Sequence, residues 1–264
     1  MWARPQTAIS RSCPRAALSA QLDLLSGKTM PVQRNAGALW IHADPRVRKT
    51  LDRLHRESKS DKLVMLRAFP TGLAALLRGQ SWFEAVTPRL KDAHLKVGFE
   101  AGELMYNTAR AIDARRIVEF GTSFGFSTIY LAAAVRDNGG GKVVTAELEP
   151  SKADTARRNF ADAGLDPFIE IRVGDAMTTL ADAEAPVDMV LLDGWKDAYI
   201  PLLKMLTPKL RRGSVVFADN VKIFKNSLKP YVEYVRDRRN GFVTTTLNAG
   251  SGFEYSVYLP SNGS

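Results

Sequence analysis

Two short segments of the sequence each place polar side chains directly after an apolar run. In VDMVLLDGWKD the run ends at Asp193, and Lys196 follows three residues later. In SVVFADN the run ends at Asp219 and Asn220. Carboxylate and amide oxygens suit Mg²⁺. If the two runs are neighbouring strands, they predict a divalent-cation site.

A glycine-containing segment, VEFGTSFGFST, follows an earlier apolar run. Gly121 and Gly125 allow a tight turn and a close approach of backbone to a ligand, ahead of a helix N-terminus. The pattern is G-x-x-x-G, because Ser123 occupies the position of the middle glycine in the dinucleotide fingerprint. The segment is therefore compatible with a nucleotide-binding loop and equally with a plain strand-to-helix turn.

Acidic residues close the next two apolar runs. Glu147 ends the second run, where a carboxylate can accept two hydrogen bonds from a ribose diol. Asp175 and Ala176 follow the third, where an adenine edge could be recognised. Together with the glycine segment they indicate an adenosine-containing ligand, and they leave a dinucleotide and S-adenosylmethionine both open.

These segments lie in an alternating series of strand and helix patterns beyond Arg115. The alternation predicts an α/β fold, a Rossmann-like, doubly wound, mostly parallel seven-stranded sheet over residues 93–264. Within it IPLLKMLTPKLRRG is predicted to be a helix. FVTTTL and FEYSVYLP flank a glycine-containing turn and predict an antiparallel C-terminal hairpin at the sheet edge. In such a sheet, ligands bind beyond the carboxyl ends of the strands, where the polar residues stand.

The N-terminal third has a different character. Residues 1–35 are rich in Arg, Ser and Ala and have no continuous apolar segment typical of a secretory signal. A disordered tail or a start at Met30 is favoured over a targeting peptide. Residues 36–92 predict a helical extension, in which Val47, Leu51 and Leu54 share one helix face. The extension is interpreted as structural packing, with a lid or a dimer contact as alternatives.

The net charge of +9 is concentrated in that third of the chain. Residues 1–62 hold 12 Lys and Arg against 5 Asp and Glu, whereas the remainder holds 25 against 23. The nearly neutral core disfavours nucleic acid without excluding it. The single Cys13 excludes an internal disulfide framework and a cysteine zinc cluster, which favours a reducing, cytoplasmic location. No apolar run reaches the roughly 18 residues of a membrane span.

From about Ala93 to Leu259 the chain resembles the cation-dependent class I O-methyltransferases, the family of catechol and caffeoyl-CoA O-methyltransferases. LLDGWKDAYIP and VVFADNV are similar to the two metal segments of that family, and GFEY resembles its acidic segment near the substrate. The resemblance implies methyl transfer from S-adenosylmethionine to a hydroxyl of a catechol-like, vicinal dihydroxy aromatic small molecule, with Mg²⁺ or another divalent cation. It also implies a homodimer.

The resemblance assigns roles by position. Asp193, Asp219 and Asn220 would hold the metal, Lys196 would be the general base, and Glu254 would meet the neighbouring substrate hydroxyl. Gly194 departs from the pattern, because catechol O-methyltransferases have a histidine there. The residues implied around S-adenosylmethionine are Val97, Glu119, Gly121, Thr122, Ser123, Gly125, Ser127, Glu147, Asp175, Ala176, Asp193 and Trp195.

Three other functions compete with this one. A tRNA hydroxyuridine O-methyltransferase would keep the chemistry and use the basic extension to grip phosphates. An NAD-dependent oxidoreductase would use the same nucleotide loops, but the missing middle glycine and the acidic pair count against it. A non-catalytic nucleotide-binding protein would have no use for the polar set around Asp193 and Asp219.

Overall fold

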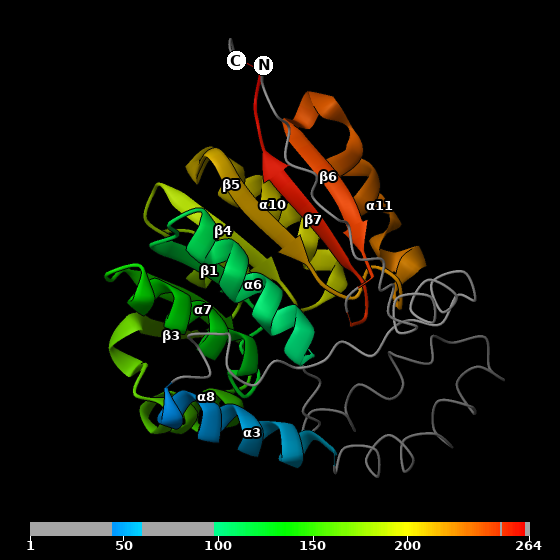
Figure 1. The fold of residues 1–264 in the computed structure, drawn as a ribbon. Coiled ribbons are helices and arrows are strands. Elements are labelled where there is room, and N and C mark those ends of the chain that lie inside the picture. The colour runs from blue at the N-terminus through cyan, green and yellow to red at the C-terminus, as the bar shows by residue number, and fades with distance from the viewer. Residues whose placement is uncertain (1–43, 60–97, 249, 262–264) are drawn as a thin grey trace, which may run out of the picture. The chain divides into compact units, whose positions relative to one another are not determined.

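The computed structural model describes residues 44–59, 98–248 and 250–261, and its centre is a seven-stranded sheet (Figure 1). The strand order is β3-β2-β1-β4-β5-β7-β6, with β7 antiparallel to both of its neighbours and the other pairings parallel. This confirms the predicted Rossmann-like, mostly parallel sheet. The strands are β1 (Arg116–Phe120), β2 (Lys142–Glu147), β3 (Ile169–Val173), β4 (Val187–Leu192), β5 (Leu210–Ala218), β6 (Phe242–Leu247) and β7 (Phe253–Tyr258).

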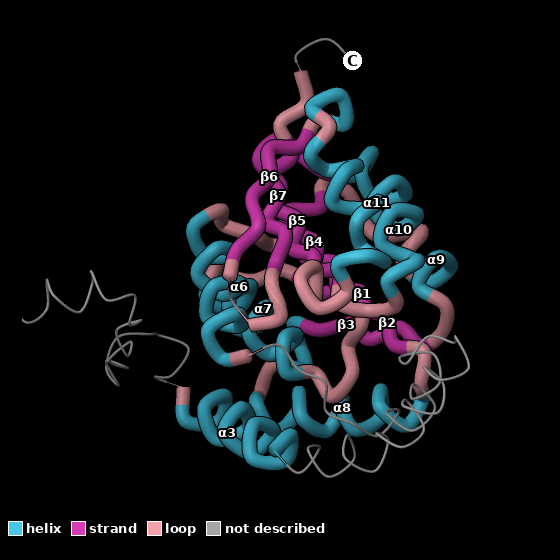
Figure 2. Tube along the Cα trace, turned by 90° about the vertical axis from the view of Figure 1, so that its right-hand side faces the viewer, coloured by secondary structure: helices cyan, strands magenta, loops and turns pink. Residues whose placement is uncertain are grey.

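Helices cover both faces of the sheet. Figures 1 and 2 show α6 and α7 on one face and α10 and α11 on the other. An apolar cluster between the sheet and the second pair includes the buried Leu203, Val216 and Tyr231. The α-helices are α3 (Pro45–Lys59), α6 (Phe99–Ala111), α7 (Phe126–Asp137), α8 (Pro150–Ala163), α9 (Ala176–Thr179), α10 (Tyr199–Leu206) and α11 (Lys225–Arg236).

The central strand β4 is buried along its whole length, as expected for a strand covered on both faces. Its one charged residue, Asp188, accepts hydrogen bonds from the backbone N–H groups of Arg115 and Arg116 at 2.8 and 2.9 Å. It also accepts one from Nε of Arg211 at 2.6 Å. Burial alone would raise the pKa of Asp188, but these bonds outweigh it and hold the pKa below its usual value. They anchor the amino end of β4.

The helix predicted from Val47, Leu51 and Leu54 is confirmed as α3, and all three side chains are buried. α3 packs on α7 and α8. Arg53 ties it to α8 by donating to Oδ1 of Asn159 and pairing with Asp162, both at 2.9 Å. The predicted tail and the rest of the predicted extension lie outside the described residues, so their roles stay predictions.

Two details differ from the sequence expectations. The helix predicted over IPLLKMLTPKLRRG ends at Leu206, and a 3₁₀ turn over Thr207–Lys209 leads into β5 at Leu210. Pro208 explains this, because proline lacks the N–H that would continue the helix. The predicted hairpin is confirmed, but of its two strands only β6 lies at the sheet edge, since β7 lies between β5 and β6.

Among the described residues, no helix has the length and apolar character needed to cross a membrane.

Candidate active site

The two polar segments meet at one edge of the sheet. β4 and β5 are adjacent and parallel, with Leu192 opposite Ala218, so Asp193 and Asp219 follow at matching positions. Nδ2 of Asn220 donates a hydrogen bond to Oδ1 of Asp193 at 2.9 Å. The condition on which the cation site was predicted, that the two strands are neighbours, is therefore met.

The backbone at Asn220 turns sharply to bring these groups together. Asn220 has a φ of +69°, in the left-handed region that asparagine tolerates better than most residues. Its N–H donates to Oδ1 of Asp219 at 2.6 Å, and the hydroxyl of Ser251 donates to the same oxygen. The other oxygen, Oδ2, accepts no hydrogen bond from the described part of the chain. Two donors thus fix the carboxylate and leave one oxygen for a ligand.

The electrostatics of this edge favour a cation. Burial, together with the charge of Asp219, raises the pKa of Asp193 well above its usual value. Burial also raises the pKa of Asp219. When all three groups are ionised, the two carboxylates and the ammonium of Lys196 have a negative net charge. No group of three or more His, Cys, Asp or Glu side chains that could bind a metal occurs in the described ranges, so an ion here would depend on two carboxylates and an amide.

Lys196 begins the short 3₁₀ turn after β4, Lys196–Ala198. Its Nζ donates to the hydroxyl of Tyr199 at 3.0 Å and lies 5.1 and 5.2 Å from the ring centres of Tyr199 and Phe224. Burial lowers the pKa of Lys196, although the charges of Asp193 and Asp219 act in the opposite direction. The two rings thus cover one side of the Lys196 ammonium, which also lies close to the carboxylates of Asp193 and Asp219.

The glycines after β1 are required by the protein's own packing. Gly121 and Gly125 have φ values of +104° and +84°. A Cβ on Gly121 would lie 2.7 Å from the carbonyl oxygen of Asp193, and one on Gly125 would lie 2.2 Å from the ring of Phe160. Gly121 thus packs against the segment after β4, which brings the glycine loop next to Asp193; the predicted close approach of this loop to a ligand stays a prediction.

Two buried acidic residues accept hydrogen bonds from this loop and from the helix that follows it. Glu119, fully buried, accepts hydrogen bonds from the hydroxyls of Ser127 and Thr128 at 2.6 and 2.5 Å. Burial raises the pKa of Glu119 despite these bonds. At the end of β2, Oε2 of Glu147 accepts from the N–H of Ser123 at 2.7 Å, and Oε1 accepts from the N–H of Glu149 at 3.0 Å.

The remaining candidates for nucleotide binding lie at the same edge. Thr122 bonds to Thr145 of β2 at 2.6 Å through their hydroxyls. The N–H of Gly174 donates to the carbonyl of Glu147 at 2.9 Å, which brings the exposed Asp175 and the buried Ala176 beside the end of β2. Trp195 is 57% exposed next to Lys196. Val97 lies outside the described residues.

Comparison with known proteins agrees with this arrangement. A family model described as a methyltransferase domain matches residues 118–221. The catechol O-methyltransferase of Niastella koreensis is 32% identical over 164 residues, an alignment that covers 58% of this chain and 73% of that enzyme. The chain belongs to the class I O-methyltransferases of the catechol and caffeoyl-CoA type.

Two further relatives support membership of this O-methyltransferase family. The catechol O-methyltransferase of Mycobacterium tuberculosis is 38% identical over 128 residues, which cover 48% of this chain and only 57% of that enzyme. The crystal structure of the O-methyltransferase TomG from Streptomyces achromogenes, in complex with SAM, has a TM-score of 0.58 and 29% identity, covering 66% of this chain and 87% of TomG. The NAD-dependent oxidoreductase considered from the sequence is therefore set aside.

Gly194, which departs from the O-methyltransferase pattern, has a packing explanation. A Cβ at this position would lie 2.3 Å from Cζ of Phe120, so the aromatic ring fills the space beside the glycine backbone. Phe120 also stands edge-on to Tyr199, with ring centres 6.4 Å apart. The size of residue 120 and the absence of a side chain at 194 are thus complementary.

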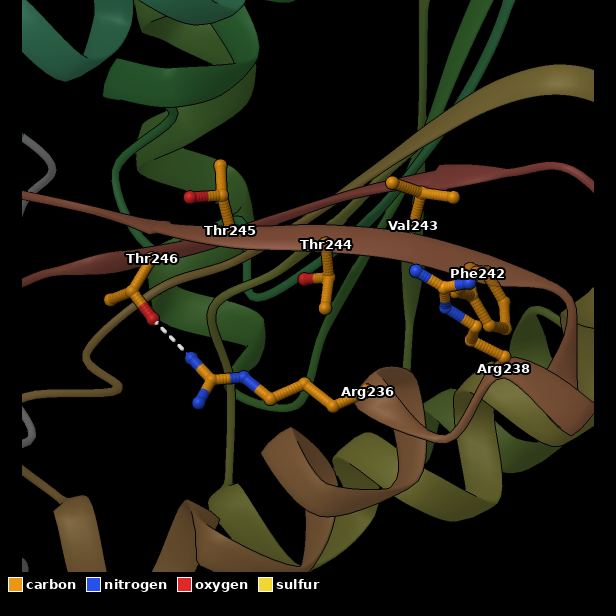
Figure 3. A pocket seen from close by; sticks show the side chains of 7 residues that line it. All are labelled: Arg236, Arg238, Phe242, Val243, Thr244, Thr245 and Thr246. Carbon is orange, nitrogen blue, oxygen red and sulfur yellow. Dashed lines mark hydrogen bonds between the residues drawn. The ribbon is translucent and has the colours of Figure 1, made fainter.

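Glu254 has partners that differ from the role implied for it. It is fully buried on β7, and its carboxylate accepts from Nε of Arg236 at 3.0 Å and from the hydroxyl of Thr244 at 2.9 Å. The hydroxyl of Thr246 donates to it as well. Arg236 and Thr246 wall a groove of about 300 Å³ along the edge strand β6, and Figure 3 shows their hydrogen bond. The buried carboxylate of Glu254 is thus held by a half-exposed arginine and two threonines, and its implied role toward the substrate hydroxyl stays a prediction.

Two residues at the site were not predicted from the sequence. Tyr199 accepts from Lys196 and donates to the carbonyl of Asp219 at 3.3 Å. Its spacing of three from Lys196, on one short helical turn, is a signal that could have indicated the contact. Ser251 lies in the β6–β7 turn, and nothing in the local sequence connects it with Asp219, which is 32 residues away.

Proposed function

We propose that this O-methyltransferase requires Mg²⁺ or another divalent cation and methylates one hydroxyl of a vicinal dihydroxy aromatic small molecule. The observation that supports this most directly is the meeting of Asp193, Asp219 and Asn220 at the ends of β4 and β5, with Lys196 beside them. Three oxygen donors of this kind match the preference of Mg²⁺, and they leave coordination positions for acceptor oxygens and water.

Asp193, Asp219 and Asn220 would hold the cation. When bound, the cation supplies positive charge that lowers the pKa of the acceptor hydroxyls. Ser251 and the N–H of Asn220 orient the carboxylate of Asp219 by occupying Oδ1. Such supporting hydrogen bonds fix the direction of a ligand oxygen and therefore contribute to affinity.

Lys196 would remove the proton of the hydroxyl that is methylated. Its lowered pKa increases the fraction of neutral amine near neutral pH. The rings of Tyr199 and Phe224 keep water from one side of Nζ. The exposed indole of Trp195 would form an apolar wall for the acceptor or the adenine.

S-adenosylmethionine, which supplies the electrophilic methyl group, would lie along the ends of β1, β2 and β3. Glu147 uses one position on each carboxylate oxygen for Ser123 and Glu149. Each oxygen keeps a further position, which suits the two hydroxyls of a ribose. The Gly121–Gly125 loop, with Ser127 and Glu119 behind it, would surround the methionine end, and Asp175 and Ala176 would lie near the adenine. Val97, a homodimer and a cytoplasmic location stay predictions.

The test is a methyl-transfer assay with S-adenosylmethionine and a panel of acceptors. The panel contains catechols, matched monohydroxy aromatics and RNA carrying a hydroxylated uridine, each with Mg²⁺ or with EDTA. We expect transfer only to catechols and only with the cation. Asp219→Ala should lose more than about a hundredfold in kcat/KM, because several kcal/mol of charge stabilisation are removed.

Asp197→Ala is the matched control. Asp197 is an exposed carboxylate on the same turn that has no role in the proposed site, so its removal should leave the rate within about twofold. Full activity in EDTA together with full activity of Asp219→Ala would refute the proposal. Cation-dependent transfer to RNA alone would favour the tRNA-modifying alternative.

A further inference from the structure

The hydroxyl of Tyr199 bridges the proposed base and a proposed metal ligand. Nζ of Lys196 donates to this hydroxyl at 3.0 Å, and the hydroxyl lies 3.3 Å from the backbone carbonyl oxygen of Asp219. A carbonyl oxygen can only accept a hydrogen bond, whereas a phenol has one proton to give. The single proton of Tyr199 is therefore directed to Asp219, and the phenol oxygen can only accept on the side of Lys196.

The direction of these two hydrogen bonds determines how the neutral amine of Lys196 can be oriented. An amine that acts as a base has two N–H groups and one lone pair. Tyr199 can hold one of the N–H groups, but it has no proton left to donate to the lone pair. The lone pair is therefore directed away from Tyr199 and stays free to take a proton from an acceptor hydroxyl.

Tyr199 is itself held rigidly. It is fully buried at the start of α10. Its ring stands edge-on to Phe120 and Tyr231, with ring centres 6.4 and 5.6 Å away. A phenol fixed on both edges cannot follow a rotating lysine chain, so its oxygen gives Nζ a defined position.

We propose that Tyr199 is a positioning residue for Lys196: its hydroxyl, fixed by the Asp219 carbonyl, holds the amine with its lone pair free for the acceptor. The proposal rests on the function proposed above, in which Lys196 is the base. It also couples the base to the loop that bears Asp219, so a shift of that loop moves Nζ.

The test uses Tyr199→Phe, which keeps the ring and its packing and removes only the hydroxyl. The matched control is Tyr231→Phe, because the hydroxyl of Tyr231 is buried and has no hydrogen-bond partner within the described residues. At saturating Mg²⁺ we expect Tyr199→Phe to lower kcat about 10- to 100-fold with KM for the acceptor within about twofold. The pH at which kcat is half-maximal should move down, because the ammonium loses an acceptor. Tyr231→Phe should change neither.

A second measurement does not depend on methyl transfer. The rate at which acetic anhydride acetylates Lys196 is followed against pH in the full-length protein, and the modified peptide is quantified by mass spectrometry. Tyr199→Phe should shift this profile downward, and Tyr231→Phe should match the wild type. Identical profiles for wild type and Tyr199→Phe would overturn the positioning role. A shifted profile in a protein with no cation-dependent methyl transfer would support the positioning role while refuting the proposed function.

Discussion

Gly194 and Phe120 form a packed pair that a single added carbon would disrupt. A Cβ at position 194 would stand 2.3, 2.5 and 2.7 Å from Cζ, Cε1 and Cε2 of the Phe120 ring. All three distances are shorter than van der Waals contact permits, so Gly194→Ala must displace the ring. Tyr199, whose ring centre is 6.4 Å away, is buried and limits the movement of the Phe120 ring on that side.

The expected energies follow from this geometry. Overpacking of this kind costs about 1–3 kcal/mol. Phe120→Leu alone removes part of a half-buried ring and should cost about 1 kcal/mol. In the double variant the smaller side chain leaves room for the methyl group, so we expect it to be more stable than the sum of the single effects by about 1–2 kcal/mol.

Urea unfolding of the full chain measures this coupling. Calorimetric titration shows whether the Kd for S-adenosylmethionine changes in the same variants. Gly98→Ala is the control, since a Cβ there would meet no atom of the described residues within 4 Å and its effect should add to that of Phe120→Leu. Additivity of Gly194→Ala and Phe120→Leu within about 0.5 kcal/mol would show that the two positions do not share a space and would refute the reasoning.

Three other perturbations test separate parts of the structure. Ser251→Ala should raise the Kd for Mg²⁺ about tenfold, because Asp219 loses an orienting donor; an unchanged Kd in a metal titration would count against this. Arg236→Met should cost about 1–2 kcal/mol in urea unfolding with an unchanged acceptor KM, since the buried carboxylate of Glu254 loses the half-exposed guanidinium that pairs with it and keeps its threonine donors; a raised KM with full stability would instead support a contact of Glu254 with the acceptor. Asp188→Asn should cost about 2 kcal/mol at pH 7. Folding lowers the pKa of Asp188, so the ionised carboxylate stabilises the folded protein above its usual pKa of 3.8. The difference in unfolding free energy between wild type and Asp188→Asn should therefore shrink as the pH falls below about 4. A difference that grows at low pH would contradict this reasoning.

Local patterns predicted the elements well because each depends on neighbouring residues. The apolar run of β4 identified a buried strand, and Gly164 ended α8 in the left-handed conformation. The sequence also located Asp193 and Asp219 at strand ends. It could state their meeting only as a condition, because strand order is a property of the whole sheet.

What the sequence did not indicate involves contacts between distant segments. Glu254 matched a family motif, but its hydrogen-bond partners lie on α11 and β6, whose positions the motif does not carry; its implied contact with the acceptor stays a prediction. Ser251 reaches Asp219 only because β7 inserts beside β5. The helix after β4 was predicted too long because the apolar pattern continued past Pro208, where the backbone cannot continue a helix.

The position of β7 between β5 and β6 also bears on how the protein acquires activity during synthesis. β5 and β6 cannot take their final spacing until residues 253–258 have been made, and Ser251 cannot reach Asp219 before then. A growing chain that already contains Asp193, Lys196 and Asp219 therefore carries an unsupported acidic pair and an unpaired β5 edge. Such an edge is prone to mispairing with other chains. Pairing of β7 with β5 thus completes this side of the sheet and, in the same step, brings Ser251 to the carboxylate of Asp219 at the proposed site.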